Sequence, residues 1–189
     1  LDNGVRVVVL RLPSVATVAV SVFVRSGSQH ESARNSGISH FIEHMAFKGT
    51  RSRDCQRINL DAERLGAEVN AHTDKDHTAF HMHGRAGDAC AFVGMLADIV
   101  RASTFPDAEL ERERGVVLHE LTDVEDDPMA TAFELFDRAC FGTHPAARPV
   151  IDRYLAALNE TDAAKRLELT RQAWTEDGGY FDPLQQAMG

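Results

Sequence analysis

Apolar and β-branched runs in the first half of the chain predict four strands. They cover residues 5–10, 17–24, 67–73 and 77–83, and a polar turn at 74–76 separates the last two. Alternation is clearest in the fourth run, where Thr78, Phe80 and Met82 share one face. The runs are short and bounded by polar or turn-forming residues, which is typical of strands in a sheet.

Most other apolar positions recur at helical spacing and predict five helices. These cover residues 38–47, 55–65, 88–102, 107–125 and 128–141. In the third of them Met95, Leu96 and Ile99 form one apolar stripe. Strands and helices are segregated along the chain more than they alternate. The predicted fold class is therefore α+β, with a mixed, largely antiparallel sheet and helices packed on one face.

Charge and composition restrict the classes of partner. The chain of 189 residues has a formal net charge of −9, with 29 acidic and 20 basic residues. Nucleic-acid binding needs an excess of lysine and arginine, so it is excluded as the main function. No apolar run is long enough to insert into a membrane. The compartment stays open: the chain begins with Leu1, so a leader could have been removed, and a soluble cytoplasmic or periplasmic protein fits equally.

The segment around His40 and His44 carries the strongest candidate chemistry. The two histidines are four residues apart on a predicted helix, so their imidazoles project from one face, one turn apart. That spacing suits two nitrogen ligands of one zinc ion. Glu43 lies beside His44, where its carboxylate can take a proton from water at the metal without being a ligand. The alternative is an ordinary solvated face of a short helix.

A third ligand is expected on the helix predicted at 107–125. Glu120 follows His44 by 76 positions, and Glu113 precedes Glu120 by two helical turns, on the same face. Apolar neighbours such as Val117 and Leu121 indicate that part of this acidic pair faces inward, and buried carboxylates need a partner. The alternative is an acidic helix with both glutamates in solvent.

The other histidines are more simply explained as surface residues. His77, His81 and His83 alternate along a predicted strand, on the face opposite Phe80. Such a row can bind metal, but a solvated sheet face is the commoner arrangement. His72 follows a neighbouring predicted strand and could approach a cleft. His119 points about 100° away from Glu120 around its helix, so it is not expected to be a ligand.

Taken together, these motifs resemble the M16 metallopeptidases, the family of pitrilysin, insulin-degrading enzyme and mitochondrial processing peptidase. The resemblance rests on HFIEHMAFKGT at 40–50, GAEVNAHT at 66–73 and ERERGVVLHE at 111–120, in the family's order. It implies one zinc ion per chain, held by His40, His44 and Glu120. It also implies Glu43 as the general base and Glu113 as an acidic residue that supports the site. By the same resemblance, Asn70 and Ala71 lie on an edge strand that binds peptide substrates by strand addition.

The resemblance covers residues 1–151, which we expect to form a partial M16-like domain. Residues 152–189 look foreign to the family and faintly resemble the C-terminal helix and tail of oligopeptide-binding proteins of ABC transporters. M16 peptidases pair two homologous halves, and the second half supplies an arginine and a tyrosine that hold the substrate. This chain is too short to contain that half.

The function predicted from the sequence is a zinc-dependent metalloendopeptidase that hydrolyses short or unfolded peptides, as the catalytic half of a two-domain or two-subunit enzyme. Its expected partners are peptide substrates and a second M16-like half, or another copy of itself. The alternative is a catalytically silent peptide-binding or assembly subunit.

Overall fold

The computed structural model describes residues 1–32, 34–147 and 149. The tail expected at 152–189 lies outside the described residues. The strands are β1 (Thr17–Val24), β2 (Glu68–Thr73) and β3 (Thr78–Arg85), and the α-helices are α1 (Ile38–Ala46), α2 (Cys55–Arg64), α3 (Ala89–Ala102), α4 (Asp107–Asp126) and α5 (Pro128–Phe141). All five predicted helices are present, with boundaries within one or two residues of those expected.

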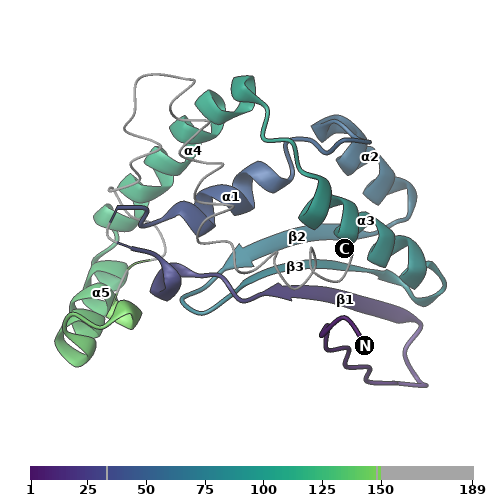
Figure 1. The fold of residues 1–189 in the computed structure, drawn as a ribbon, viewed down its shortest axis with the longest axis horizontal. Helices are drawn as coiled ribbons and strands as arrows, with labels where there is room; N and C mark the ends of the chain where they lie inside the picture. Colours follow the sequence, from purple (N-terminus) through teal and green to yellow (C-terminus); the bar gives the residue numbers. More distant parts are fainter. Residues whose placement is uncertain (33, 148, 150–189) are drawn as a thin grey trace.

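The three strands form one antiparallel sheet in the order β1-β3-β2. β3 is central, so Phe80 pairs with Val22 on one side and with Ala71 on the other. Helices α1 and α2 pack on β2, while α3 packs on β1 and β3 (Figure 1). The antiparallel sheet with helices on one face confirms the predicted α+β class.

The main core lies between the sheet and this helical layer. Its fully buried members include Phe80 and Met82 from β3, Ile58 from α2, and Phe92 and Leu96 from α3. Every second residue of β1, from Val18 to Val24, packs against the same cluster. The predicted alternation of β3 is confirmed, because Thr78, Phe80 and Met82 are buried while His83 on the opposite face is exposed.

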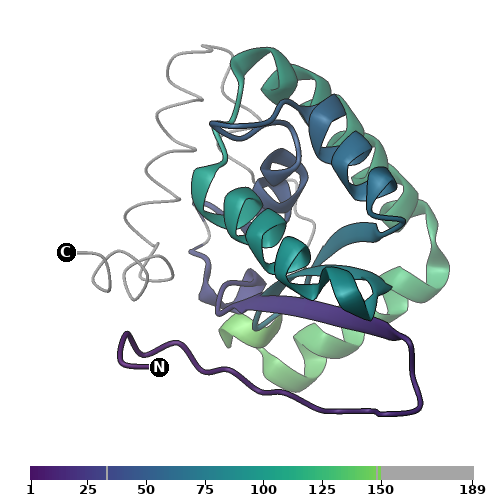
Figure 2. The same ribbon diagram turned by 90° about the vertical axis from the view of Figure 1, so that its right-hand side faces the viewer.

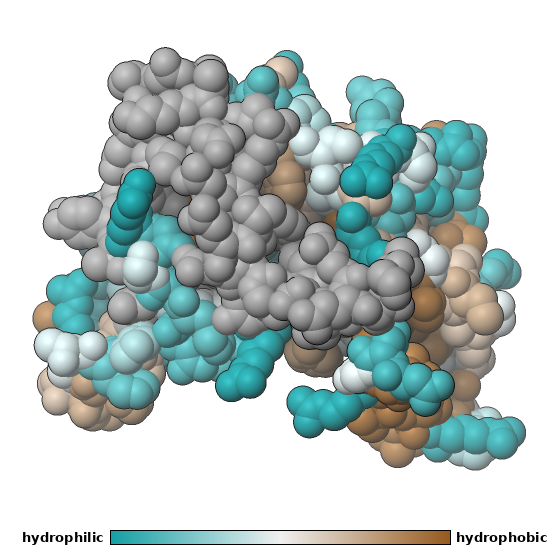
Figure 3. Space-filling view, viewed as in Figure 1, coloured by the Kyte–Doolittle hydropathy of each residue, from teal (hydrophilic) through white to brown (hydrophobic). Residues whose placement is uncertain are grey.

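The strand predicted at 5–10 is wrong. Within the described residues this segment pairs with no strand, and Val8 and Val9 are 92% and 83% exposed. It runs past β1 on the side opposite α3 (Figure 2) and contributes to an apolar surface near the N-terminus (Figure 3). β-branched residues favour extended backbone, but a strand also needs a neighbouring edge to accept its hydrogen bonds.

Helix α1 begins at a special turn that the sequence pattern did not reveal. Its N-cap residue, Gly37, has a φ of 86°, a left-handed conformation that glycine adopts without strain, and it offers no side chain for capping. The buried carboxylate of Glu31 takes that role: Oε2 accepts from the Gly37 N–H at 2.5 Å and Oε1 from the Ser39 N–H at 2.8 Å. A negative charge here also matches the positive end of the helix dipole.

The last two helices form the outer part of the molecule. Helix α4 packs on α1 and α5 packs on α4 (Figure 1). No residue of α5 is buried, and its side chains Met129, Phe133 and Phe136 are all more than 60% exposed. In the described part of the chain, no helix combines the length and the apolar character that crossing a membrane requires.

Candidate metal centre

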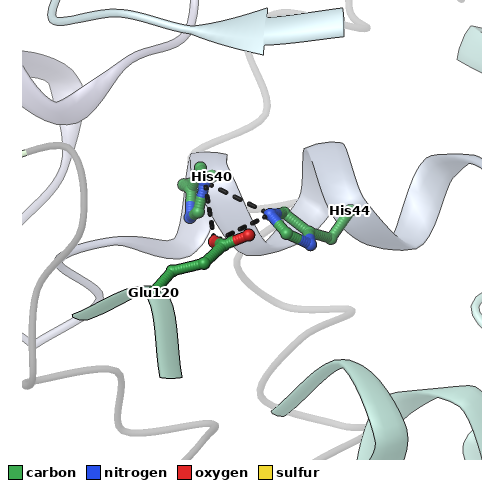
Figure 4. A group of neighbouring side chains, drawn as sticks. All are labelled: His40, His44 and Glu120. Carbon is green, nitrogen blue, oxygen red and sulfur yellow. Dashed lines mark hydrogen bonds and ion pairs between the residues drawn. The ribbon is translucent and has the colours of Figure 1, made fainter. Parts of the chain in front are cut away.

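Two histidines from α1 and one glutamate from α4 converge on one point (Figure 4). The Nε2 atoms of His40 and His44 are 3.2 Å apart. Oε2 of Glu120 lies 3.7 Å from Nε2 of His40 and 3.3 Å from Nε2 of His44. Among the described residues, this is the one group of three or more His, Cys, Asp or Glu side chains compact enough to hold a metal ion.

The separations fit a zinc ion. A tetrahedral zinc with bonds of about 2.0–2.1 Å places its ligand atoms about 3.3 Å from each other. The three separations of 3.2, 3.3 and 3.7 Å are close to that value. Oε2 of Glu120 is also buried without a hydrogen-bond partner. A buried carboxylate oxygen that faces two imidazole nitrogens and has no hydrogen-bond partner is well placed to bind a cation together with them.

Burial of α1 favours the neutral, ligand form of His40. Desolvation, with a smaller effect of neighbouring His44, lowers the pKa of His40 to about 4. The ring is therefore uncharged at neutral pH, and a nitrogen lone pair is available to a metal. The Nδ1 atom of His40 is buried and has no hydrogen-bond partner among the described residues.

His44 has a partner on its other ring nitrogen. Its Nδ1 lies 3.1 Å from Oε2 of Glu113, a residue that is only 6% exposed. The second carboxylate oxygen of Glu113, Oε1, lies 2.6 Å from Nζ of Lys48. Glu113 therefore contacts the site without entering the ligand group. Sequence reasoning found Glu113 but missed Lys48, which follows the end of α1 by two residues and contacts a carboxylate on another helix.

Glu43 lies beside the ligands, and β2 holds its carboxylate. The hydroxyl of Thr73 donates to Oε2 of Glu43 at 2.6 Å. Burial raises the pKa of Glu43. The hydrogen bond from Thr73 and the neighbouring His44 lower that pKa, whereas the nearby carboxylate of Glu120 raises it. A carboxylate with a raised pKa is a better proton acceptor. Sequence reasoning missed Thr73, because a threonine at a strand end is common and carries no signal of its own.

The other predicted residues lie on or next to the sheet, outside the ligand group. Asn70 and Ala71 are on β2, the outermost strand on this side of the described sheet. Oδ1 of Asn70 accepts from the Ala71 N–H at 2.8 Å. The ring centroid of His72 lies 5.4 Å from that of His77 and 5.9 Å from that of His81. Among the described residues, these three histidines do not form a group compact enough to hold a metal ion.

The expectation for His119 agrees with the structure. Its side chain is 79% exposed and lies 3.9 Å from Asp123 on the same helix, so it is directed away from the site.

Comparison with known proteins places these features in one family. The family model described as "Insulinase (Peptidase family M16)" matches residues 6–153. An uncharacterized zinc protease of Bacillus subtilis, YmxG, is 37% identical over 160 residues, which cover 84% of this chain and 39% of that protein. The mitochondrial-processing peptidase subunit beta of Rattus norvegicus is 35% identical over 151 residues, covering 80% of this chain and 31% of that protein.

Solved structures support the same fold. A protease from Helicobacter pylori superposes with a TM-score of 0.76 at 22% sequence identity, covering 89% of this chain and 39% of that one. The chain thus spans about a third of the length of the relatives it matches.

Proposed function

The chain belongs to peptidase family M16, and we propose that it provides the catalytic half-site of a zinc-dependent metalloendopeptidase acting on short or unfolded peptides. The observation that carries this proposal is the convergence of His40, His44 and Glu120, whose ligand atoms lie at separations suited to one zinc ion. A protein that only binds peptides has no need for such a set.

Each residue has a distinct role in this proposal. His40, His44 and Glu120 hold one zinc ion per chain. When bound, zinc acts as a Lewis acid that makes water more acidic and polarises the carbonyl of a peptide. Glu43 accepts the proton that water loses on attack and passes it to the leaving nitrogen. Burial raises the pKa of Glu43, which makes its carboxylate a better proton acceptor for the first step.

Peptides are proposed to bind along β2. The edge of β2 that faces away from β3 pairs with no strand among the described residues, so an extended peptide can add to the sheet there. Asn70 and Ala71 would then contact the substrate. A peptide that takes the Ala71 N–H has to displace the side chain of Asn70, which occupies it at 2.8 Å. The strand leads directly to Thr73 and its contact with Glu43, so a peptide on this edge approaches the base.

A second M16-like half, in a partner chain or in another copy, is the proposed partner. One relative is named as a subunit of a processing peptidase, and the present chain spans only 31% of that relative. Attack on a peptide also needs donors for the developing oxyanion, and losing one such donor commonly costs about 10²–10³ in rate. We therefore expect the chain alone to be nearly inactive even with zinc, and we propose that the second half completes the site.

Metal analysis tests the ligand set directly. We expect one zinc per chain in the purified protein, and Glu120→Gln should weaken zinc binding by more than about 100-fold, since a ligand matters more than its supporting residues. Asp123→Asn is the matched control: it removes one carboxylate from the same helix, one turn further on, and should leave zinc binding unchanged. Equal zinc affinity in both variants would exclude Glu120 as a ligand.

A peptidase assay with a candidate partner tests catalysis. Glu43→Gln should retain zinc but lower chelator-sensitive cleavage by about 10²–10⁴-fold, because an amide cannot accept the proton. Full zinc occupancy without any cleavage by the assembled wild type would favour the alternative, a silent peptide-binding or assembly subunit.

A further inference from the structure

Beyond the ligands themselves, we propose that Lys48 is a positioning residue for the metal centre, acting through Glu113 to fix the proton on Nδ1 of His44. The inference rests on the proposed function only for its consequence in catalysis. Its evidence is a continuous chain of contacts: Lys48 Nζ to Glu113 Oε1 at 2.6 Å, and Glu113 Oε2 to His44 Nδ1 at 3.1 Å. These contacts connect Lys48, which follows α1 by two residues, and His44 on α1 to Glu113 on α4.

Burial makes both contacts of Glu113 necessary. The residue is 6% exposed, and a carboxylate removed from water needs partners for its oxygens and its charge. Lys48 supplies a cation to one oxygen, and its own side chain is 23% exposed, so it reaches Glu113 from the rim of the site. The other oxygen is left for His44. Without Lys48, the carboxylate loses its bound cation and is free to rotate toward solvent.

The consequence falls on the tautomer of His44. A carboxylate can only accept, so the contact at Nδ1 requires a proton on that nitrogen. In the neutral ring the lone pair is then on Nε2, the atom that faces Nε2 of His40 and Oε2 of Glu120. A carboxylate behind the ring thus orients it and selects the metal-binding tautomer before any metal arrives.

The two histidines differ in this respect. Nδ1 of His40 has no partner among the described residues, whereas Nδ1 of His44 has a buried carboxylate that a lysine holds in place. His44 is therefore the ligand whose orientation the chain itself determines most strongly. The competing explanation is that Lys48 and Glu113 form an ordinary ion pair that only fastens α1 to α4.

Nitrogen-15 NMR of the histidine rings in the metal-free full-length chain separates these explanations. At pH 8, in the presence of chelator, we expect wild-type His44 to carry its proton on Nδ1. Lys48→Met keeps the length of the side chain and removes its charge, and it should shift His44 toward the Nε2-protonated form that neutral histidine prefers in water. Lys48→Arg keeps a cation and should restore the wild-type signal.

The matched control is Arg112→Met. Arg112 is next to Glu113 on α4, is 72% exposed and pairs with Glu109, so this change also removes one positive charge near Glu113 but leaves the contact between Lys48 and Glu113 in place. It should leave the His44 signal unchanged. Circular dichroism of each variant identifies a change that merely unfolds the chain. In that event, Glu113→Leu, which leaves Nδ1 of His44 without its acceptor, replaces Lys48→Met as the test, and a wild-type His44 signal in Glu113→Leu contradicts the proposal.

An unchanged His44 tautomer in folded Lys48→Met would overturn the inference and leave Lys48 as a fastening residue. Because the measurement uses neither metal nor peptide, its outcome is independent of whether the chain proves to be a peptidase. In an active assembly, Lys48→Met should also lower kcat/KM about 10–100-fold, the usual cost of losing a supporting residue, and Lys48→Arg should recover most of it.

Discussion

The two helices that supply the ligands are held in different ways. In α1, six of nine residues are buried, and the helix packs directly on β2. In α4, three of twenty residues are buried, and the helix rests on α1. The two histidines therefore lie on a helix that is firmly packed against the sheet. Glu120 lies three positions after Val117, the last buried residue of α4, and its side chain is 38% exposed.

This difference indicates what a metal would add. The two imidazoles are already brought together by the packing of α1, so zinc needs to order little there. In α4, no residue after Val117 is buried. Bonding of Glu120 to a metal would tie α4 to α1, and that part of the binding free energy would act as local folding free energy. We expect substitutions in α1 to lower the stability of the metal-free chain more than substitutions in α4.

The largest contrast should come from apolar truncations. Met45 on α1 is fully buried, and Met45→Ala should lower the free energy of unfolding by about 2–5 kcal/mol through lost contacts and a cavity. Leu118 on α4 is 37% exposed, and Leu118→Ala should change it by no more than about 0.5 kcal/mol. Urea unfolding of the metal-free chain measures both. Similar losses in the two variants would mean that α4 is as firmly packed as α1.

A smaller effect is expected at the start of α1. Glu31→Gln keeps the shape of the side chain but removes the charge that accepts two helical N–H groups, and we expect a loss of about 1–3 kcal/mol. No side chain caps the start of α4, where the N-cap residue is Pro106, so no equivalent substitution exists there. Hydrogen exchange of the α1 amides should accelerate in the variant. An unchanged exchange rate would mean that packing alone, without the cap from Glu31, stabilises the start of α1.

The sequence was sufficient to predict what depends on local spacing. Four-residue spacing placed His40 and His44 on one face, and seven-residue spacing placed Glu113 and Glu120 on another, because helical geometry is the same wherever a helix forms. The apolar stripes of the helices and the alternation of β3 were predictable for the same reason. The family resemblance then indicated that the two helices meet.

What the sequence did not reveal depends on contacts between distant segments. Glu31 caps α1 from a preceding loop, and Thr73 reaches Glu43 across 30 positions, so neither follows a periodic pattern. The strand predicted at 5–10 failed for a related reason: strand propensity is local, but pairing requires another edge. Lys48 lies just after α1, and only the structure connects it to a carboxylate on another helix.

The smallest effect should appear where the sheet contacts the base. Glu43 is on the fixed helix, and the hydroxyl of Thr73 fastens its carboxylate to β2 at 2.6 Å, whereas no described hydrogen bond fixes Oε2 of Glu120. In an active assembly, Thr73→Val should lower kcat about tenfold with little change in KM. That loss is below the 10²–10⁴ that a general base contributes, because Thr73 only orients the base. Thr73→Ser retains the hydroxyl and should restore kcat. If serine and valine behave alike, the loss comes from packing at the end of β2, and the carboxylate of Glu43 is positioned by α1 alone.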